Sequence, residues 1–280
     1  MEYDALPRTA AERRRVRSVL RDGSLVVVGS GIRAPAQVTQ EALVHIERAT
    51  RVFSLVADPL AEAWLASINP MTQSLAGFYA VDKPREQTYE DMVATIVATV
   101  ERGERVCAVA YGHPGVYAYP LHEAIRRVRA LHLDATMLPG ISAEDCLYAE
   151  LGIDPAQTGA CSFEATDFLI YDRHVDRTAT LILWQIGVIG EWSYKRVAGV
   201  WNIDGVHALI ERLERSYDRD HEVIVFQSAR LITGESIVVR TPLHALAAAP
   251  ITPLSTLVIP PAAKPVANLA LFARLSKAPA

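Results

Sequence analysis

Apolar and polar residues alternate along the first half of the chain in a way that predicts strands and helices in succession. Residues 24–31 form an apolar run that ends in a glycine turn, as a buried strand does, and residues 39–49 carry apolar side chains at the spacing of one helical face. Two more strand–helix pairs are predicted at residues 51–57 with 61–68 and at residues 105–111 with 121–131. This alternation is typical of a mainly parallel sheet covered by helices.

After about residue 138 the pattern becomes richer in strands. Strand-like runs occur at residues 178–190, 221–229, 235–241 and 255–261, and helical patterns at residues 141–152 and 203–217. We therefore predict a two-domain α/β protein. Its parts are an extension (1–23), an N-terminal domain with a mainly parallel sheet (24–137), a mixed, strand-richer C-terminal domain (138–262) and a helical tail (263–280).

Composition and charge narrow the classes of partner. The formal charge of −4 gives no reason to expect a nucleic-acid partner. One local basic cluster is predicted to be a solvated or subunit-contacting helix: Arg13, Arg14, Arg15, Arg17 and Arg21. The N-terminus lacks the layout of a secretory signal, and no run of about 18 apolar residues could span a membrane. Three widely spaced cysteines predict reduced, buried thiols and a cytoplasmic location.

Several common catalytic motifs are missing from the chain. It has no G-x-S-x-G, H-E-x-x-H, C-x-x-C or G-K-[ST] segment, and its eight histidines lack metal-ligand spacing, so no metal is predicted. The glycine turn at residues 29–34 imitates a dinucleotide-binding fingerprint. Pro35, however, interrupts the opening turn of the helix that this fingerprint requires, which disfavours a nicotinamide-dependent oxidoreductase.

Residues 111–120 (YGHPGVYAYP) follow a predicted parallel strand, and ligands of such sheets lie beyond the carboxyl ends of the strands. Gly112 and Gly115 would let backbone N–H groups approach a ligand where a Cβ would clash. A plain turn needs one glycine or proline, so we interpret this segment as a ligand loop.

Two capping boxes predict helix starts. Ser142 with Asp145 begins one helix, where the first-turn acids Glu144 and Asp145 could be catalytic but are better explained as complementing the helix dipole. Thr88 with Asp91 begins the other and places Tyr89 at its first position. The positive field there, together with Lys83 and Arg85 in the preceding loop, would lower the pKa of Tyr89. The alternative is a surface loop with ordinary charges.

These segments resemble the tetrapyrrole-methylase superfamily of S-adenosylmethionine (SAM) methyltransferases, and within it the borosin peptide backbone α-N-methyltransferases. The resemblance covers most of residues 24–275. It rests on VGSGI, FYA with R-x-x-T-Y, YGHPGV, PGISAEDCL, LGIDP, SFEATDF, LWQIG and STLVIPP. It implies two α/β domains with SAM in the cleft between them.

The resemblance also implies roles for individual residues. Arg85 and Tyr89 match the arginine and tyrosine that are catalytic in that family, and Tyr79 matches a further active-site tyrosine. The predicted SAM-binding residues are Tyr111, Gly112, His113, Gly115, Val116, Ser142, Ala143, Gln185, Ser228, Ser255 and Thr256, although the sequence around Ser228 diverges from the family. Tyr117 and Tyr119 are predicted to be packing residues.

The implied reaction is methylation of peptide backbone amides, with S-adenosylhomocysteine as the second product. Fused borosins carry their substrate as a C-terminal extension, whereas this sequence stops at Ala280 without one, so the resemblance implies the split type. We expect a separate precursor peptide and a homodimer, or a heterotetramer with two peptides. The alternatives are a precorrin- or uroporphyrinogen-type C-methyltransferase, expected to lack the Arg85 and Tyr89 set, and a non-catalytic SAM- or peptide-binding partner.

Overall fold

The structure is a computed structural model that describes residues 23–276 apart from positions 57, 196, 198 and 232. Contacts divide the described chain into two compact units, each built on a five-stranded sheet. The first unit comprises the described residues of three segments: those up to Ala149, those within Trp192–Arg196 and those within Ser228–Glu235. The second unit comprises the other described residues. The predicted arginine cluster (13–21) lies outside the described residues, and the predicted domain boundaries stay predictions.

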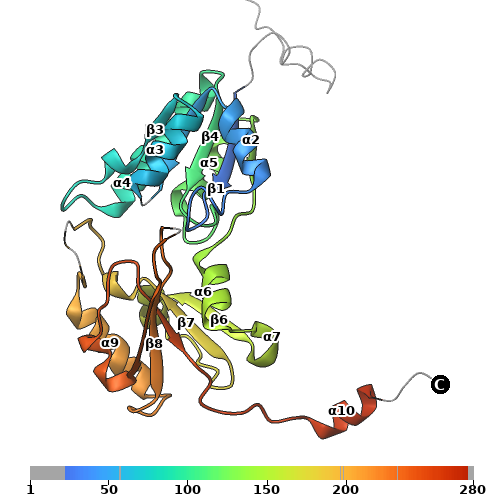
Figure 1. Cartoon of the computed structure of the whole chain (residues 1–280), viewed down its shortest axis with the longest axis vertical. Coiled ribbons are helices and arrows are strands. Elements are labelled where there is room, and N and C mark those ends of the chain that lie inside the picture. The colour runs from blue at the N-terminus through green and yellow to red at the C-terminus, as the bar shows by residue number, and fades with distance from the viewer. Residues whose placement is uncertain (1–22, 57, 196, 198, 232, 277–280) are drawn as a thin grey trace, which may run out of the picture. The chain divides into compact units, whose positions relative to one another are not determined.

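The first unit alternates strands and helices, as the hydrophobic pattern predicts (Figure 1). Its elements are β1 (Ser24–Gly29), α2 (Gln40–Arg48), β2 (Arg51–Leu55), α3 (Pro59–Ile68), β3 (Thr72–Ser74), η1 (Ala76–Phe78), α4 (Arg85–Glu101), β4 (Arg105–Ala110), α5 (Tyr119–Ala130), β5 (Asp134–Met137) and α6 (Ala143–Leu151), which begins in this unit.

The sheet of the first unit is parallel throughout, in the order β3-β2-β4-β1-β5. Helices α4 and α5 pack on one face through residues such as Ile96 and Val128. Helices α2 and α3 cover the other face through residues such as Ile46 and Leu65. Because both faces are covered, the central strands are continuous apolar runs rather than alternating ones. The carboxyl ends of these strands lie at one edge of the sheet, and the loops that leave this edge carry most of the predicted site residues.

The second unit is richer in strands and has a mixed sheet, as predicted. Its elements are α7 (Pro155–Thr158), β6 (Ala160–Glu164), α8 (Ala165–Ile170), β7 (Thr180–Trp184), η2 (Ile186–Val188), α9 (Ile203–Glu214), β8 (Glu222–Gln227), β9 (Ile237–Pro242), η3 (Leu243–Ala248), β10 (Thr256–Ile259) and α10 (Leu269–Leu275).

The second sheet has the order β6-β7-β10-β8-β9, in which β6 pairs with β7 in parallel and the other pairs are antiparallel. One face is covered by α8, α9 and η3, whose Phe168, Leu209 and Leu243 are completely buried. β9 lies at an edge and alternates half-buried and exposed residues, as an edge strand does. Within the described part of the chain, no helix is both long and apolar enough to cross a membrane.

Candidate active site

The three predicted catalytic residues lie together in the first unit. Tyr79 follows η1, and Arg85 begins α4. Tyr89 lies four residues further along α4, so its side chain shares a helix face with that of Arg85. The Tyr79 and Tyr89 hydroxyls share a hydrogen bond, and the Arg85 charge acts on Tyr79. The structure therefore forms a compact Tyr–Arg–Tyr cluster from a loop and one helix.

Tyr79 is a neutral phenol in this cluster. Burial, the largest influence, raises its pKa well above the ordinary value, and the neighbouring Tyr89 raises it further. The Arg85 charge lowers the pKa of Tyr79, but burial outweighs this effect. Arg85 therefore does not make Tyr79 more acidic than an ordinary tyrosine, and Tyr79 carries a proton with which it can donate a hydrogen bond.

Helix α4 begins earlier than the predicted Thr88–Asp91 capping box. Its first residue is Arg85, and the N–H of Arg85 donates to the carbonyl of Trp192 at 2.9 Å. Thr88 is buried inside the first turns, where its hydroxyl donates to the Pro84 carbonyl at 3.2 Å instead of capping the helix. Tyr89 thus lies a full turn inside the helix, where the field of the helix end has weakened.

Lys83 has hydrogen-bond partners on both sides of the loop. Its Nζ donates to a carboxylate oxygen of Asp91 at 2.6 Å and to the carbonyl oxygen of Phe78 at 3.0 Å. Gln87 also donates to Asp91, at 2.9 Å. These bonds join the loop that contains Tyr79 to helix α4, which contains Arg85 and Tyr89. Lys83 therefore fixes the loop of Tyr79 against the helix that carries Arg85 and Tyr89.

Replacing Lys83 by methionine is expected to lower turnover about tenfold, because the loop would lose its bonds to Asp91 and Phe78 and the reacting groups would be held less well. Methionine preserves the apolar stem of lysine. The measurement is the initial rate with saturating amounts of the two substrates that the resemblance implies, SAM and an acceptor peptide. Lys264→Met, at an exposed lysine of the second unit, is the matched control and should match the wild type. Equal rates for both variants would contradict this role.

A main-chain strap that sequence analysis missed runs beside the cluster. Residues 192–194 pair with residues 81–85 through bridges between Val81 and Tyr194 and between Pro84 and Ser193. The N–H of Asp82 also donates to the Tyr194 carbonyl at 3.2 Å. No local pattern in the sequence signals this pairing, because its partners are far apart along the chain.

The backbone N–H groups of the loop after β4 are not arranged as predicted for a ligand loop. The Gly112 N–H donates to the Gly31 carbonyl at 3.0 Å, and the Gly115 N–H donates to His113 Nδ1 at 3.0 Å. The Val116 N–H donates to the His113 carbonyl at 3.2 Å. These three N–H groups are satisfied inside the protein, so the expectation that they point at a ligand is wrong. The SAM-binding roles of this loop remain a prediction for Tyr111, Gly112, His113, Gly115 and Val116.

Glycines are needed here because three loops cross closely. A Cβ on Gly29 would lie 2.2 Å from the Gly112 carbonyl oxygen, and one on Gly140 would lie 3.2 Å from the Gly29 Cα. Gly112 itself has φ +72°, a left-handed conformation that favours glycine. The glycine that ends β1 and those that follow β4 and β5 therefore let these segments pack against one another.

The predicted helix start at Ser142 is confirmed. The Ser142 N–H and hydroxyl both donate to Asp145, at 2.6 and 2.7 Å, and the Asp145 N–H donates back to Ser142 Oγ at 3.1 Å. Glu144 accepts a hydrogen bond from Tyr148 at 2.7 Å. Both acids therefore have structural partners in the helix that Ala143 begins.

Two observations fit a polar ligand at the predicted SAM residues of the first unit. Ser228 Oγ is buried and has no hydrogen-bond partner among the described residues, as a hydroxyl reserved for a ligand would be. Tyr111 is largely buried, and this burial raises the pKa of its phenol to about 12 against the lowering effect of the Arg230 charge. Tyr111 is therefore a neutral donor, and Arg230 is a nearby cation that sequence analysis missed.

The remaining predicted SAM residues lie close together in the second unit. Gln185 follows β7, while Ser255 precedes β10 and Thr256 begins it. The Ile186 N–H donates to the Ser255 carbonyl at 3.1 Å, which joins the two segments. Gln185 has φ +61°, a left-handed backbone conformation that is uncommon for residues other than glycine and is enriched at functional sites.

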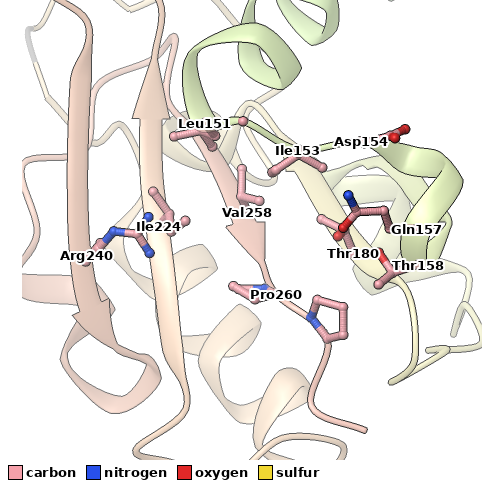
Figure 2. A pocket seen from close by; sticks show the side chains of 12 residues that line it. Leu151, Ile153, Asp154, Gln157, Thr158, Thr180, Ile224, Arg240, Val258 and Pro260 are labelled. Atoms are coloured by element: carbon pink, nitrogen blue, oxygen red, sulfur yellow. The ribbon is translucent and has the colours of Figure 1, made fainter. Parts of the chain in front are cut away.

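The second unit also contains an open pocket of about 240 Å³, which Figure 2 shows from close by. Leu151, Ile153 and Val258 form part of its apolar wall, and Arg240 lies at one side. None of the predicted site residues lines this pocket. The pocket thus shares no lining residue with the Tyr–Arg–Tyr cluster or with the predicted SAM residues.

The prediction that Tyr117 and Tyr119 are packing residues is wrong, because both side chains are exposed to solvent. Their exposed fractions are 48% and 61%, because Tyr117 lies in a turn with φ +52° and Tyr119 begins α5 at the surface. The Tyr119 ring does lie 6.3 Å from that of Tyr89, measured between ring centroids. Tyr119 therefore extends the cluster toward solvent.

Residues 24–247 match the protein-family model described as Tetrapyrrole (Corrin/Porphyrin) Methylases. A methyltransferase/ribosomally synthesized cyclic peptide gymnopeptides precursor from Gymnopus fusipes is 40% identical over 243 residues, which are 85% of this chain and 57% of the relative. The omphalotin A precursor from Omphalotus olearius is 38% identical over 262 residues, 92% of this chain and 62% of the relative. A type III borosin cyclic peptide precursor from Anomoporia bombycina is 40% identical over 264 residues, 93% of this chain.

The chain spans 57%, 30% and 62% of the lengths of the Gymnopus, Anomoporia and Omphalotus relatives. These similarities confirm the resemblance to borosin methyltransferases. Among solved structures, uroporphyrin-III-C-methyltransferase from Thermus thermophilus has a TM-score of 0.61 at 17% identity, covering 93% of this chain and 99% of that chain. Cobalt precorrin-4 methyltransferase has a TM-score of 0.60 at 17% identity, covering 85% and 94%. At such identities these structures show the fold alone.

Proposed function

Because the chain belongs to the tetrapyrrole (corrin/porphyrin) methylases, a family of SAM-dependent methyltransferases, we propose that it methylates backbone amide nitrogens of a peptide. The observation that carries the proposal is the cluster of Tyr79, Arg85 and Tyr89, in which a partly buried phenol, a second phenol and a guanidinium adjoin. The roughly 40% identity to methyltransferase/cyclic peptide precursors supports a peptide substrate.

The chemistry of an amide explains why such a cluster is needed. The lone pair of an amide nitrogen is delocalised into the carbonyl, so the nitrogen is a poor nucleophile. It becomes reactive when its proton is removed and the negative charge that develops on the oxygen is stabilised. A methylating enzyme therefore needs a proton acceptor beside the nitrogen and hydrogen-bond donors or a cation beside the oxygen. Bound SAM supplies the methyl group as an electrophile.

We assign these tasks to the three residues as follows. Tyr79 is protonated, so it donates a hydrogen bond to the amide oxygen, and Arg85 stabilises the negative charge that develops there. Tyr89 would act in its phenolate form, accept the amide proton and become a phenol; it lies beside Tyr79 and shares a helix face with Arg85. Burial of the cluster strengthens these electrostatic interactions.

The predicted SAM residues would hold the methyl donor. Tyr111 and Ser228 present a phenol and an unpaired hydroxyl in the first unit. In the second unit Gln185, Ser255 and Thr256 would contribute, although Ser255 and Thr256 are buried and Ser255 Oγ accepts from the Thr252 N–H at 2.9 Å. His113, Val116 and Ala143 would line the site in the first unit. The shapes of the β4 and β1 loops, set by their glycines, keep these side chains in place.

We further propose that the acceptor peptide is a separate molecule and that the enzyme acts as a homodimer, alone or with two bound peptides. In the relatives from Gymnopus fusipes and Omphalotus olearius, methyltransferase and precursor peptide belong to one product. A separate peptide needs only to reach the cluster in an extended form. Light scattering coupled to gel filtration, with and without peptide, measures the assembly, and a monomeric mass under both conditions would rule out the dimer.

The proposed activity is tested by incubating the purified protein with SAM and synthetic apolar peptides rich in valine and isoleucine. Tandem mass spectrometry should show mass gains in methyl-sized steps that fragment ions place on backbone nitrogens. Fusing the same peptide to the C-terminus distinguishes the two arrangements: methylation of the fused peptide alone would refute the separate substrate but leave N-methylation standing.

Two outcomes would replace the proposal. Turnover of uroporphyrinogen III with none of peptides would establish a tetrapyrrole C-methyltransferase, the runner-up. Calorimetric binding of SAM without turnover of any acceptor would indicate a non-catalytic binding protein.

A further inference from the structure

The strap of residues 192–194 places one more aromatic ring in the cluster. The Tyr194 and Tyr79 ring centroids lie 5.4 Å apart, with their planes tilted by 41°. This separation and tilt are within the favourable range for aromatic pairs. Tyr194 also influences the ionisation of Tyr79, which indicates that the two rings share one environment.

The strap is fixed to the catalytic segment by its backbone. The Tyr194 N–H donates to the Lys83 carbonyl at 3.4 Å, and the Tyr194 carbonyl accepts from the Asp82 N–H at 3.2 Å. Two residues earlier, the Trp192 carbonyl accepts from the N–H of Arg85. The same three strap residues therefore hold the first residue of α4 and cover Tyr79. This arrangement couples the position of the Tyr79 ring to that of the Arg85 backbone.

Four tyrosines form a row across four separate segments. The row begins at exposed Tyr119 on α5, continues through Tyr89 on α4 and Tyr79 after η1, and ends at Tyr194 on the strap. Tyr79 lies between two of them. Its hydroxyl side meets Tyr89, and its ring meets Tyr194, so the orientation of its O–H bond depends on both neighbours.

We propose that Tyr194 is a positioning residue of the active site, whose ring packs against Tyr79 and holds the Tyr79 hydroxyl where the amide oxygen of the peptide is bound. This inference rests on the proposed peptide methylation. The part of Tyr194 that acts is the ring, because the ring makes the contact with Tyr79. Its role is distinct from those of Tyr79, Arg85 and Tyr89, which would touch the reacting amide.

The test uses the full chain with 3-fluorotyrosine incorporated at position 79, so that fluorine NMR reports on this residue alone. Tyr194→Leu removes the ring, Tyr194→Phe keeps the ring without the hydroxyl, and Tyr171→Leu removes an exposed tyrosine of the second unit as the matched control. Unlabelled versions of the same variants are assayed for kcat and for peptide KM. SAM affinity, measured by calorimetry, verifies that each variant is folded. If Tyr194→Leu is not folded, Tyr194→Met takes its place.

The leucine variant is expected to shift the fluorine resonance and to lower the pH at which residue 79 titrates. Water would then reach a phenol whose pKa is raised mainly by burial, while its charged and titratable neighbours Arg85 and Tyr89 are unchanged. Its kcat should fall on the order of tenfold to a hundredfold with peptide KM within about twofold. Tyr194→Phe and Tyr171→Leu should behave as the wild type.

A leucine variant with the wild-type resonance and kcat would overturn the inference. A phenylalanine variant as impaired as the leucine variant would also overturn it, because the hydroxyl and not the ring would then matter. If the unmodified protein methylates no peptide, the proposed function fails, and the fluorine spectra still decide whether Tyr194 positions Tyr79.

Discussion

Replacing Arg85 by alanine, or Tyr89 by phenylalanine, is expected to lower turnover at least about a hundredfold while the dissociation constant for SAM stays nearly unchanged. The alanine variant removes the cation that stabilises charge on the amide oxygen. The phenylalanine variant keeps the ring and removes the proton acceptor. Neither side chain belongs to the predicted SAM-binding set, so the loss should fall on kcat. Single-turnover rates, measured beside SAM binding by calorimetry, separate the two effects.

The controls for this experiment are drawn from the same chain. Arg126→Ala removes an arginine of α5 that pairs with Glu123 outside the cluster, and Tyr171→Phe removes the hydroxyl of an exposed tyrosine. Both should retain the wild-type rate. Wild-type rates for Arg85→Ala and Tyr89→Phe as well would show that the cluster is not catalytic, and equal losses of SAM affinity would show that it binds the methyl donor instead.

Replacing Gly29 by alanine is expected to lower both thermal stability and SAM affinity. The new Cβ would lie 2.2 Å from the Gly112 carbonyl oxygen, a backbone atom that can retreat only by moving the loop after β4. Overpacking of this kind costs about 1–3 kcal/mol. For a chain of this size, each kcal/mol lowers the unfolding midpoint by about 2–4 °C. Because the displaced loop carries Tyr111 and His113, SAM should bind at least about tenfold more weakly.

Gly77→Ala is the matched control for Gly29→Ala. A Cβ on Gly77 meets nothing within 4 Å, and this glycine is not in a left-handed conformation. Its alanine variant should therefore unfold within about 1 °C of the wild type. Differential scanning fluorimetry and calorimetric SAM titration measure both properties. A Gly29→Ala protein as stable as the Gly77 variant would contradict the close approach of the β1 and β4 loops.

Short-range signals in the sequence predict most of the secondary structure. Thr39 caps α2 by accepting from the Ala42 N–H at 3.1 Å, and Ser142 with Asp145 begins α6. These signals succeed because each depends on residues within three positions of one another. The alternation of strands and helices likewise predicts the parallel first sheet, since its strands are covered on both faces.

The members of the Tyr–Arg–Tyr cluster could be predicted from the sequence, but the electrostatics of the cluster could not. The R-x-x-T-Y segment and the tyrosine before it identify Arg85, Tyr89 and Tyr79 through the resemblance. The protonation of Tyr79 depends on how far the folded unit buries it, and the partner of Lys83, Asp91, is set by the packing of a loop on a helix. Neither burial nor an ion pair between a loop and a helix can be read from spacing alone.

The sequence by itself determined the order of the elements, the two kinds of sheet and the residues of the cluster, because periodicity and short motifs are local properties. The tertiary structure alone decided where α4 begins, which partners satisfy the backbone of the glycine loop, and that Tyr194 covers Tyr79. Each of these depends on a contact between segments distant in the chain: Arg85 with Trp192, Gly112 with Gly31, and Tyr79 with Tyr194. Such contacts form only when the sheet and its loops have brought those segments together.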